Sequence, residues 1–109
     1  MKPQEYIISK LKNFTKKFPN ARVRYEYDER AEVHVVEVLP SEVYYSDDGY
    51  VSWERALFAK FAALYPDEFV GFITDGDSPG IEKAAYTSEG RDYTPARRKA
   101  KAQAAEYAY

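Results

Sequence analysis

Residues 22 to 28, Arg-Val-Arg-Tyr-Glu-Tyr-Asp, alternate strictly between charged and apolar side chains. A period of two places the valine and both tyrosines on one face of a β-strand, so this strand needs cover on one side only. A second β-branched run, residues 32 to 39, follows a short polar turn and is close enough to pair with the first as a hairpin. Its alternation slips at Val35-Val36, which indicates either a bulge or a central strand with both faces covered.

Two other segments carry apolar side chains at helical spacing and can supply the cover. In the first segment these positions recur at intervals of four, three and four, at Ile7, Leu11, Phe14 and Phe18. This stripe predicts an amphipathic helix over about 3 to 17. Ser52 is a suitable N-cap for a second helix that runs to about Tyr65.

The fold class follows from the order of these segments. Residues 69 to 74 have the length and the residue types of a buried strand, and a strand, a helix and a further strand require a crossover connection. We therefore predict an α+β fold, a two-layer α/β sandwich with a small mixed sheet and the order α-β-β-α-β. Residues 84 to 87 and 91 to 93 could add an edge hairpin. The stretch 42 to 46 fits either a loop or a strand.

The length and the composition limit the organisation of the chain. A chain of 109 residues with 45% hydrophobic residues can bury one core. We assign residues 1 to 94 to a single α+β domain, and residues 95 to 109 to a basic, alanine-rich C-terminal helix or tail that Thr94-Pro95 opens. The absence of cysteine excludes disulfides, thiolate nucleophiles and the usual structural zinc sites. We expect no cofactor.

Charge is distributed unevenly along the chain. Residues 1 to 19 carry five lysines and one glutamate, and residues 95 to 109 carry four basic residues and one glutamate, whereas the segment between them is strongly acidic. The N-terminus has no apolar stretch of signal or membrane-spanning length, since lysines interrupt it. We therefore expect a cytoplasmic protein with no membrane partner.

One motif suggests catalysis. Gly76-x-Ser78-x-Gly80 has the spacing of a hydrolase nucleophile elbow, in which the residue after the serine donates its backbone N–H to the oxyanion. Here that residue is Pro79, which has no N–H. The one histidine, His34, precedes the serine, whereas an α/β-hydrolase places its histidine last. A serine hydrolase at Ser78 is therefore the last of three functional interpretations, and we expect no enzyme.

The same loop and the histidine have structural explanations. Asp75 and Asp77 are weak candidates for a hard-cation site, but the pattern is incomplete and turns also favour aspartate, so we predict no metal site. His34 stands alone in its strand and is expected to be a packed or hydrogen-bonded sheet residue. A cross-strand neighbour such as Glu26 could affect its protonation.

Tyrosines around an acidic turn give the first functional interpretation. The chain has eleven tyrosines, more than one small core can hide, and tyrosine is favoured at interfaces. We therefore predict a non-catalytic interaction protein that binds another protein or itself through an acidic, tyrosine-rich surface or through the C-terminal helix. The candidate contact residues of that surface are Tyr44, Tyr45, Asp47, Asp48 and Tyr50.

The basic ends give the second interpretation. If the first and last helices lie side by side, their cations could contact nucleic-acid phosphates. The candidate residues are Lys12, Lys16, Arg97, Arg98, Lys99 and Lys101. The acidic middle of the chain would oppose this binding unless the basic face pointed away from it.

Overall fold

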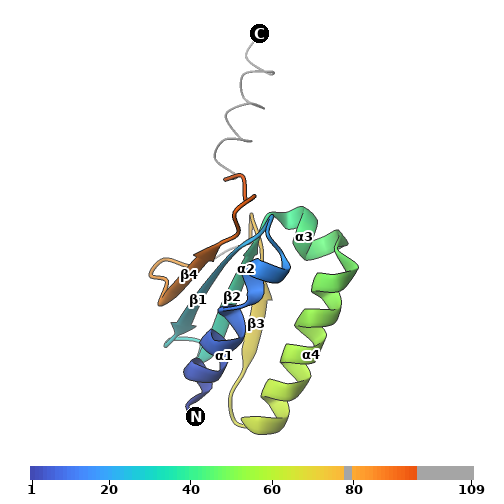
Figure 1. Cartoon of the computed structure of the whole chain (residues 1–109). Coiled ribbons are helices and arrows are strands. Elements are labelled where there is room, and N and C mark those ends of the chain that lie inside the picture. The colour runs from blue at the N-terminus through green and yellow to red at the C-terminus, as the bar shows by residue number, and fades with distance from the viewer. Residues whose placement is uncertain (78–79, 96–109) are drawn as a thin grey trace.

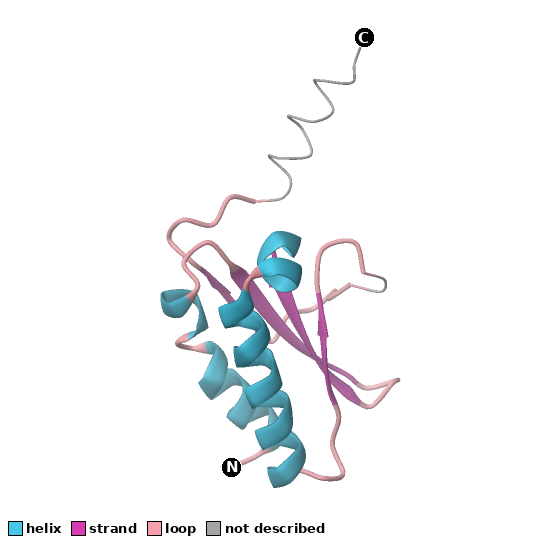
Figure 2. Ribbon diagram, turned by 90° about the vertical axis from the view of Figure 1, so that its right-hand side faces the viewer, coloured by secondary structure: helices cyan, strands magenta, loops and turns pink. Residues whose placement is uncertain are grey.

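The computed structural model describes residues 1–77 and 80–95. Helices lie on one side of a four-stranded sheet, which makes two layers (Figures 1 and 2). The elements in chain order are α1 (Pro3–Leu11), α2 (Phe14–Lys17), β1 (Arg22–Asp28), β2 (Val33–Leu39), α3 (Ser41–Ser46), α4 (Asp48–Leu64), β3 (Val70–Ile73) and β4 (Tyr86–Glu89). The predicted α+β class with a small mixed sheet is confirmed. No helix of the described residues is long and apolar enough to span a bilayer.

The sheet has the order β3-β2-β1-β4. β1 pairs antiparallel with β2 as the predicted hairpin, and β4 pairs antiparallel with the other side of β1. After the crossover through α3 and α4, β3 lies parallel to β2, with Val70 opposite His34. β3 and β4 are therefore the two edges of the sheet.

The core lies between the helices and one face of the sheet. All four predicted positions of the N-terminal stripe are buried, and Ile7 and Leu11 are fully enclosed. They pack against Val23 and Tyr25 of β1 and against the apolar face of β2, as the alternation predicts. The slip at Val35-Val36 is not a bulge, because the pairing with β1 continues unbroken through it. It reflects a central strand whose opposite face is also covered, since Glu37 and Leu39 are buried there.

Several local predictions needed correction. The N-terminal helix breaks after Leu11 and resumes as the short α2, and residues 41–46 form the helix α3. Helix α4 begins at Asp48 rather than at Ser52, because Asp47 serves as its N-cap and accepts a hydrogen bond from the Tyr50 backbone N–H.

The predicted edge hairpin is a single strand, β4. Beyond it, the backbone N–H of Gly90 donates to the Ala21 carbonyl, and that of Asp92 donates to the Pro19 carbonyl. The chain therefore continues alongside the segment that precedes β1 instead of turning back to form a second strand. The predicted C-terminal helix, apart from Pro95, lies outside the described residues.

Candidate functional site

The predicted tyrosine-rich surface divides into buried and exposed parts. Tyr50 is 0% exposed and belongs to the core, where its hydroxyl donates to Glu54 at 2.6 Å. Tyr44 is half-buried and its hydroxyl donates to the carbonyl oxygen of Phe72 at 2.7 Å, which ties α3 to β3. Tyr45 is 67% exposed. Of the three tyrosines, Tyr45 is therefore the one whose side chain is exposed to solvent.

The acidic residues of this surface stabilise a helix terminus. Asp47 caps α4, and Asp48 lies in its first turn, where a negative charge favours the positive end of the helix dipole. Burial raises the pKa of the Tyr50 phenol, and so does the hydrogen bond to Glu54. Burial also raises the pKa of Tyr44. Both phenols are held neutral, which suits structural contacts.

Two phenylalanines that the sequence reasoning did not single out are the exposed aromatic residues beside β3. Phe69 is 67% exposed and Phe58 is 53% exposed. Between them lies a cavity of about 160 Å³, lined by Phe58, Phe61, Ala62, Pro66, Glu68, Phe69 and Val70. Phe58 comes from α4, and Phe69 comes directly before β3.

Directly behind this cavity, three polar side chains form a chain of hydrogen bonds. The Tyr25 hydroxyl and His34 Nδ1 are 2.7 Å apart, and His34 Nε2 and Glu68 Oε1 are 2.9 Å apart. Tyr25 and His34 are 1% and 3% exposed, whereas the Glu68 side chain is 35% exposed. Burial raises the pKa of Tyr25 to about 12, and the charge of Glu68 adds to the effect. The phenol and the imidazole are shielded from solvent, and the two hydrogen bonds join the loop before β3 to the sheet.

His34 is a hydrogen-bonded sheet residue, as expected, but its carboxylate neighbour is Glu68 rather than Glu26. In the β1–β2 register Glu26 lies opposite Val35 and faces the other side of the sheet. The partnership with Glu68 depends on the parallel pairing of β2 with β3, which brings together residues far apart in sequence. The sequence signal was the position of Glu68 immediately before a predicted strand.

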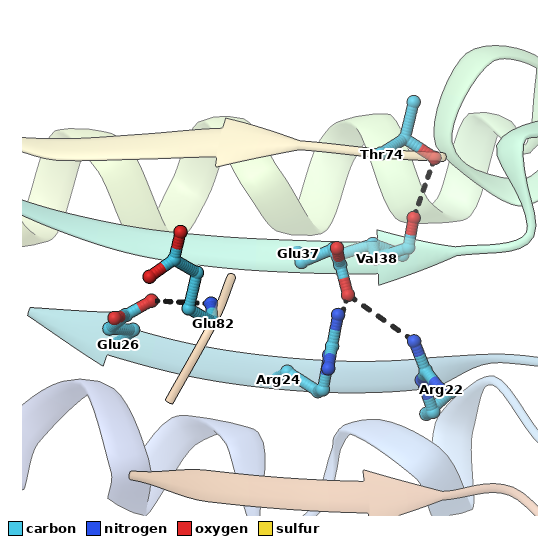
Figure 3. A network of polar contacts seen from close by, with 7 residues as sticks. All are labelled: Arg22, Arg24, Glu26, Glu37, Val38, Thr74 and Glu82. Carbon is cyan, nitrogen blue, oxygen red and sulfur yellow. Dashed lines mark hydrogen bonds and ion pairs between the residues drawn. The ribbon is translucent and has the colours of Figure 1, made fainter. Parts of the chain in front are cut away.

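The face of the sheet away from the helices holds an ion cluster (Figure 3). Glu37 accepts hydrogen bonds from Arg24 Nε at 2.7 Å and from Arg22 Nη2 at 3.3 Å. The Glu37 side chain is 8% exposed. The connection from β3 to β4 crosses this face, since the Glu82 backbone N–H donates to Glu26. The cluster fixes β1 against β2 under that connection.

One of the two acidic residues in the loop after β3, Asp77, stabilises the loop itself. Asp77 accepts a hydrogen bond from the Thr74 backbone N–H at 2.8 Å, and the Thr74 hydroxyl donates to the carbonyl of Val38. Asp75 is exposed. No group of three or more potential metal ligands occurs within residues 1–77 and 80–95. Ser78 lies outside the described residues.

The basic candidates are only partly described. Lys12 and Lys16 are exposed around α1 and α2, whereas Arg97, Arg98, Lys99 and Lys101 lie outside the described residues. Lys16 borders a hollow of about 330 Å³, which is lined by Thr15, Lys16, Pro19, Glu89, Gly90 and Arg91. Two cations and one carboxylate thus surround this hollow.

Comparisons of the chain with family models, with curated proteins and with solved structures found no match.

Proposed function

We propose that this protein is a non-catalytic interaction protein that binds another protein, or a second copy of itself, along the edge of the sheet formed by β3. The observation that carries the proposal is the pair of exposed rings there, Phe69 and Phe58, at 67% and 53% exposure. Large aromatic side chains that stay in water beside a cavity are typical of contact surfaces.

The chemistry of the edge strand supports this surface. β3 has the sequence Val-Gly-Phe-Ile, without the charges or proline that commonly protect an exposed edge from pairing. At its carboxyl end, Tyr44 already donates to the carbonyl of Phe72 and Asp77 accepts from the N–H of Thr74. A partner strand would therefore add at the amino end of β3, next to Phe69.

The cavity between Phe58 and Phe69 could hold one side chain of the partner. It has about 160 Å³ and a mainly apolar lining, which suits one aliphatic or aromatic side chain of the partner. Its carboxylate, Glu68, is already bonded to His34. Tyr25 and His34 are buried behind it, which favours recognition over catalysis at this place.

The predicted acidic, tyrosine-rich surface contributes to this proposal through Tyr45. Tyr44 and Tyr50 are engaged in contacts with Phe72 and Glu54, and Asp47 caps α4. Tyr45 is exposed on α3, and its neighbour Tyr44 contacts β3. We therefore place the main contact at Phe58 and Phe69 and a secondary one at Tyr45.

The test compares Phe69→Ser and Phe58→Ser with Leu64→Ser as the matched control. Leu64 is 52% exposed on the same helix as Phe58 but does not border the cavity. Sedimentation over a wide concentration range reports self-association, and a pull-down from the native host reports other partners. We expect the association to be lost in both phenylalanine variants and kept in Leu64→Ser. A concentration-independent monomer without a specific partner contradicts the proposal, and so does equal loss in the control.

A nucleic-acid-associated function is the second candidate, because Lys16 and Arg91 border the same hollow of about 330 Å³. Cations gathered at one place can hold a phosphate. Salt-sensitive retention on immobilised DNA or RNA tests this candidate. We expect the retention to weaken as salt rises and to be lost when Lys16 and Arg91, or Arg97, Arg98, Lys99 and Lys101, are neutralised. No retention, or retention that is unaffected by salt, contradicts the candidate.

A further inference from the structure

A second cavity lies between α1 and α4, on the outer side of the helical layer. It has a volume of about 200 Å³ and is lined by Tyr6, Lys10, Trp53, Ala56, Leu57 and Lys60. The rings of Tyr6 on α1 and Phe61 on α4 are 6.3 Å apart, and Phe14 of the following helix α2 contacts Trp53 of α4 with ring centres 4.7 Å apart. The cavity thus lies where α1 approaches α4.

The lining combines an apolar interior with a positive rim. Trp53, Leu57 and Ala56 offer no charge, whereas Lys10 and Lys60 bring one ammonium group from each helix. Lys10 Nζ lies 5.4 Å from the centre of the Tyr6 ring. Neither lysine takes part in an ion pair within the described part of the chain, and no lining residue is acidic. The charge that complements this rim is negative.

We propose that the cavity between α1 and α4 binds a small monocarboxylate with an apolar body, whose carboxylate pairs with Lys10 and Lys60 while its chain or ring lies against Trp53 and Leu57. The volume limits the size of the ligand. Since a water molecule occupies about 30 Å³ of the liquid, the cavity has room for about seven atoms of that size. This suits a carboxylic acid of six to eight carbons, roughly, and excludes a long nucleic acid or a folded partner.

Trp53 makes the proposal measurable, because it is the one tryptophan of the chain and lines the cavity. The experiment titrates the full chain with sodium octanoate below its micelle concentration, at constant ionic strength, and follows tryptophan emission. Octanol and octylammonium are the matched neutral and cationic probes. We expect saturable binding of octanoate that is about fivefold tighter than that of octanol, because one partly exposed ion pair contributes about that ratio. Octylammonium should bind more weakly than octanol, because its positive charge is repelled by the two lysines.

Variants separate this site from general surface charge. Lys10→Met with Lys60→Met should bring octanoate to the affinity of octanol. Lys17→Met with Lys83→Met, which removes two exposed cations outside the cavity, should leave octanoate binding unchanged. Equal affinities of the unmodified protein for octanoate and octanol, no saturable change in emission, or equal loss in the control variant would each overturn the proposal. The comparison of octanoate with octanol uses the unmodified protein, so its result does not depend on whether a variant folds.

Discussion

Gly90 provides the sharpest test of how the C-terminal part of the sheet is held. A Cβ atom built on Gly90 would lie 2.8 Å from the Cα of Pro19, 2.5 Å from its carbonyl carbon and closer still to its oxygen. These are backbone atoms, so no side-chain rotation can relieve the clash. Gly90→Ala must therefore separate two chain segments that hydrogen bonds now join, from Gly90 N to Ala21 O at 2.8 Å and from Asp92 N to Pro19 O at 3.0 Å.

The expected cost follows from those two bonds. Each contributes about 1 kcal/mol to stability, and leaving buried backbone groups unpaired adds to the loss. Alanine recovers about 0.4–1 kcal/mol because it restricts the unfolded chain. We therefore expect Gly90→Ala to lower the free energy of unfolding by about 2 kcal/mol, which corresponds to a fall of roughly 10 °C in the midpoint of thermal unfolding.

The assay is urea denaturation followed through the emission of Trp53, with Gly71→Ala as the control. A Cβ on Gly71 would meet only Val33 Cγ2, at an ordinary 3.9 Å. The control should therefore stay within about 0.5 kcal/mol of the unsubstituted protein. If Gly90→Ala is as stable as Gly71→Ala, the close approach of the segment after β4 to Pro19 does not exist in solution, and the reasoning fails.

Three further substitutions test other contacts. Glu37→Gln should cost about 2 kcal/mol in urea denaturation, because two arginines lose their buried carboxylate; a stability equal to wild type would mean that the cluster is not formed. Asp47→Ala should cost about 1 kcal/mol through loss of the N-cap of α4, and a matched Asp48→Ala should cost less because its carboxylate acts only on the helix dipole. Stability should fall as pH rises from 10 towards 12, because Tyr25 keeps its proton in the folded state, with a pKa of about 12, while the unfolded chain loses it near 10. Tyr25→Phe should flatten that fall, and an unchanged slope in pH-dependent denaturation would count against the raised pKa.

The proposed interaction surface and the core differ in how far the sequence predicted them. The N-terminal stripe and the alternation of residues 22 to 28 predicted which side chains are buried, because helical and strand periods assign faces without knowledge of their partners. The same reasoning could not assign Tyr50. Its place beside an acidic turn suggested a surface, yet the start of α4 at Asp48 turns its ring into the core.

Sequence alone therefore determined the β1–β2 hairpin, the main helices and their apolar faces, since these depend on contacts and spacings within short segments of chain. It did not decide that residues 41–46 form a helix. Tertiary structure decided which residues from distant segments meet. It paired His34 with Glu68 through the parallel register of β2 and β3, and it left Phe58 and Phe69 uncovered at the sheet edge. It also brought Lys10 and Lys60 to one cavity. The physical reason is that hydrophobic periodicity specifies the direction in which a side chain points, whereas the neighbour found in that direction depends on how the elements are arranged in space.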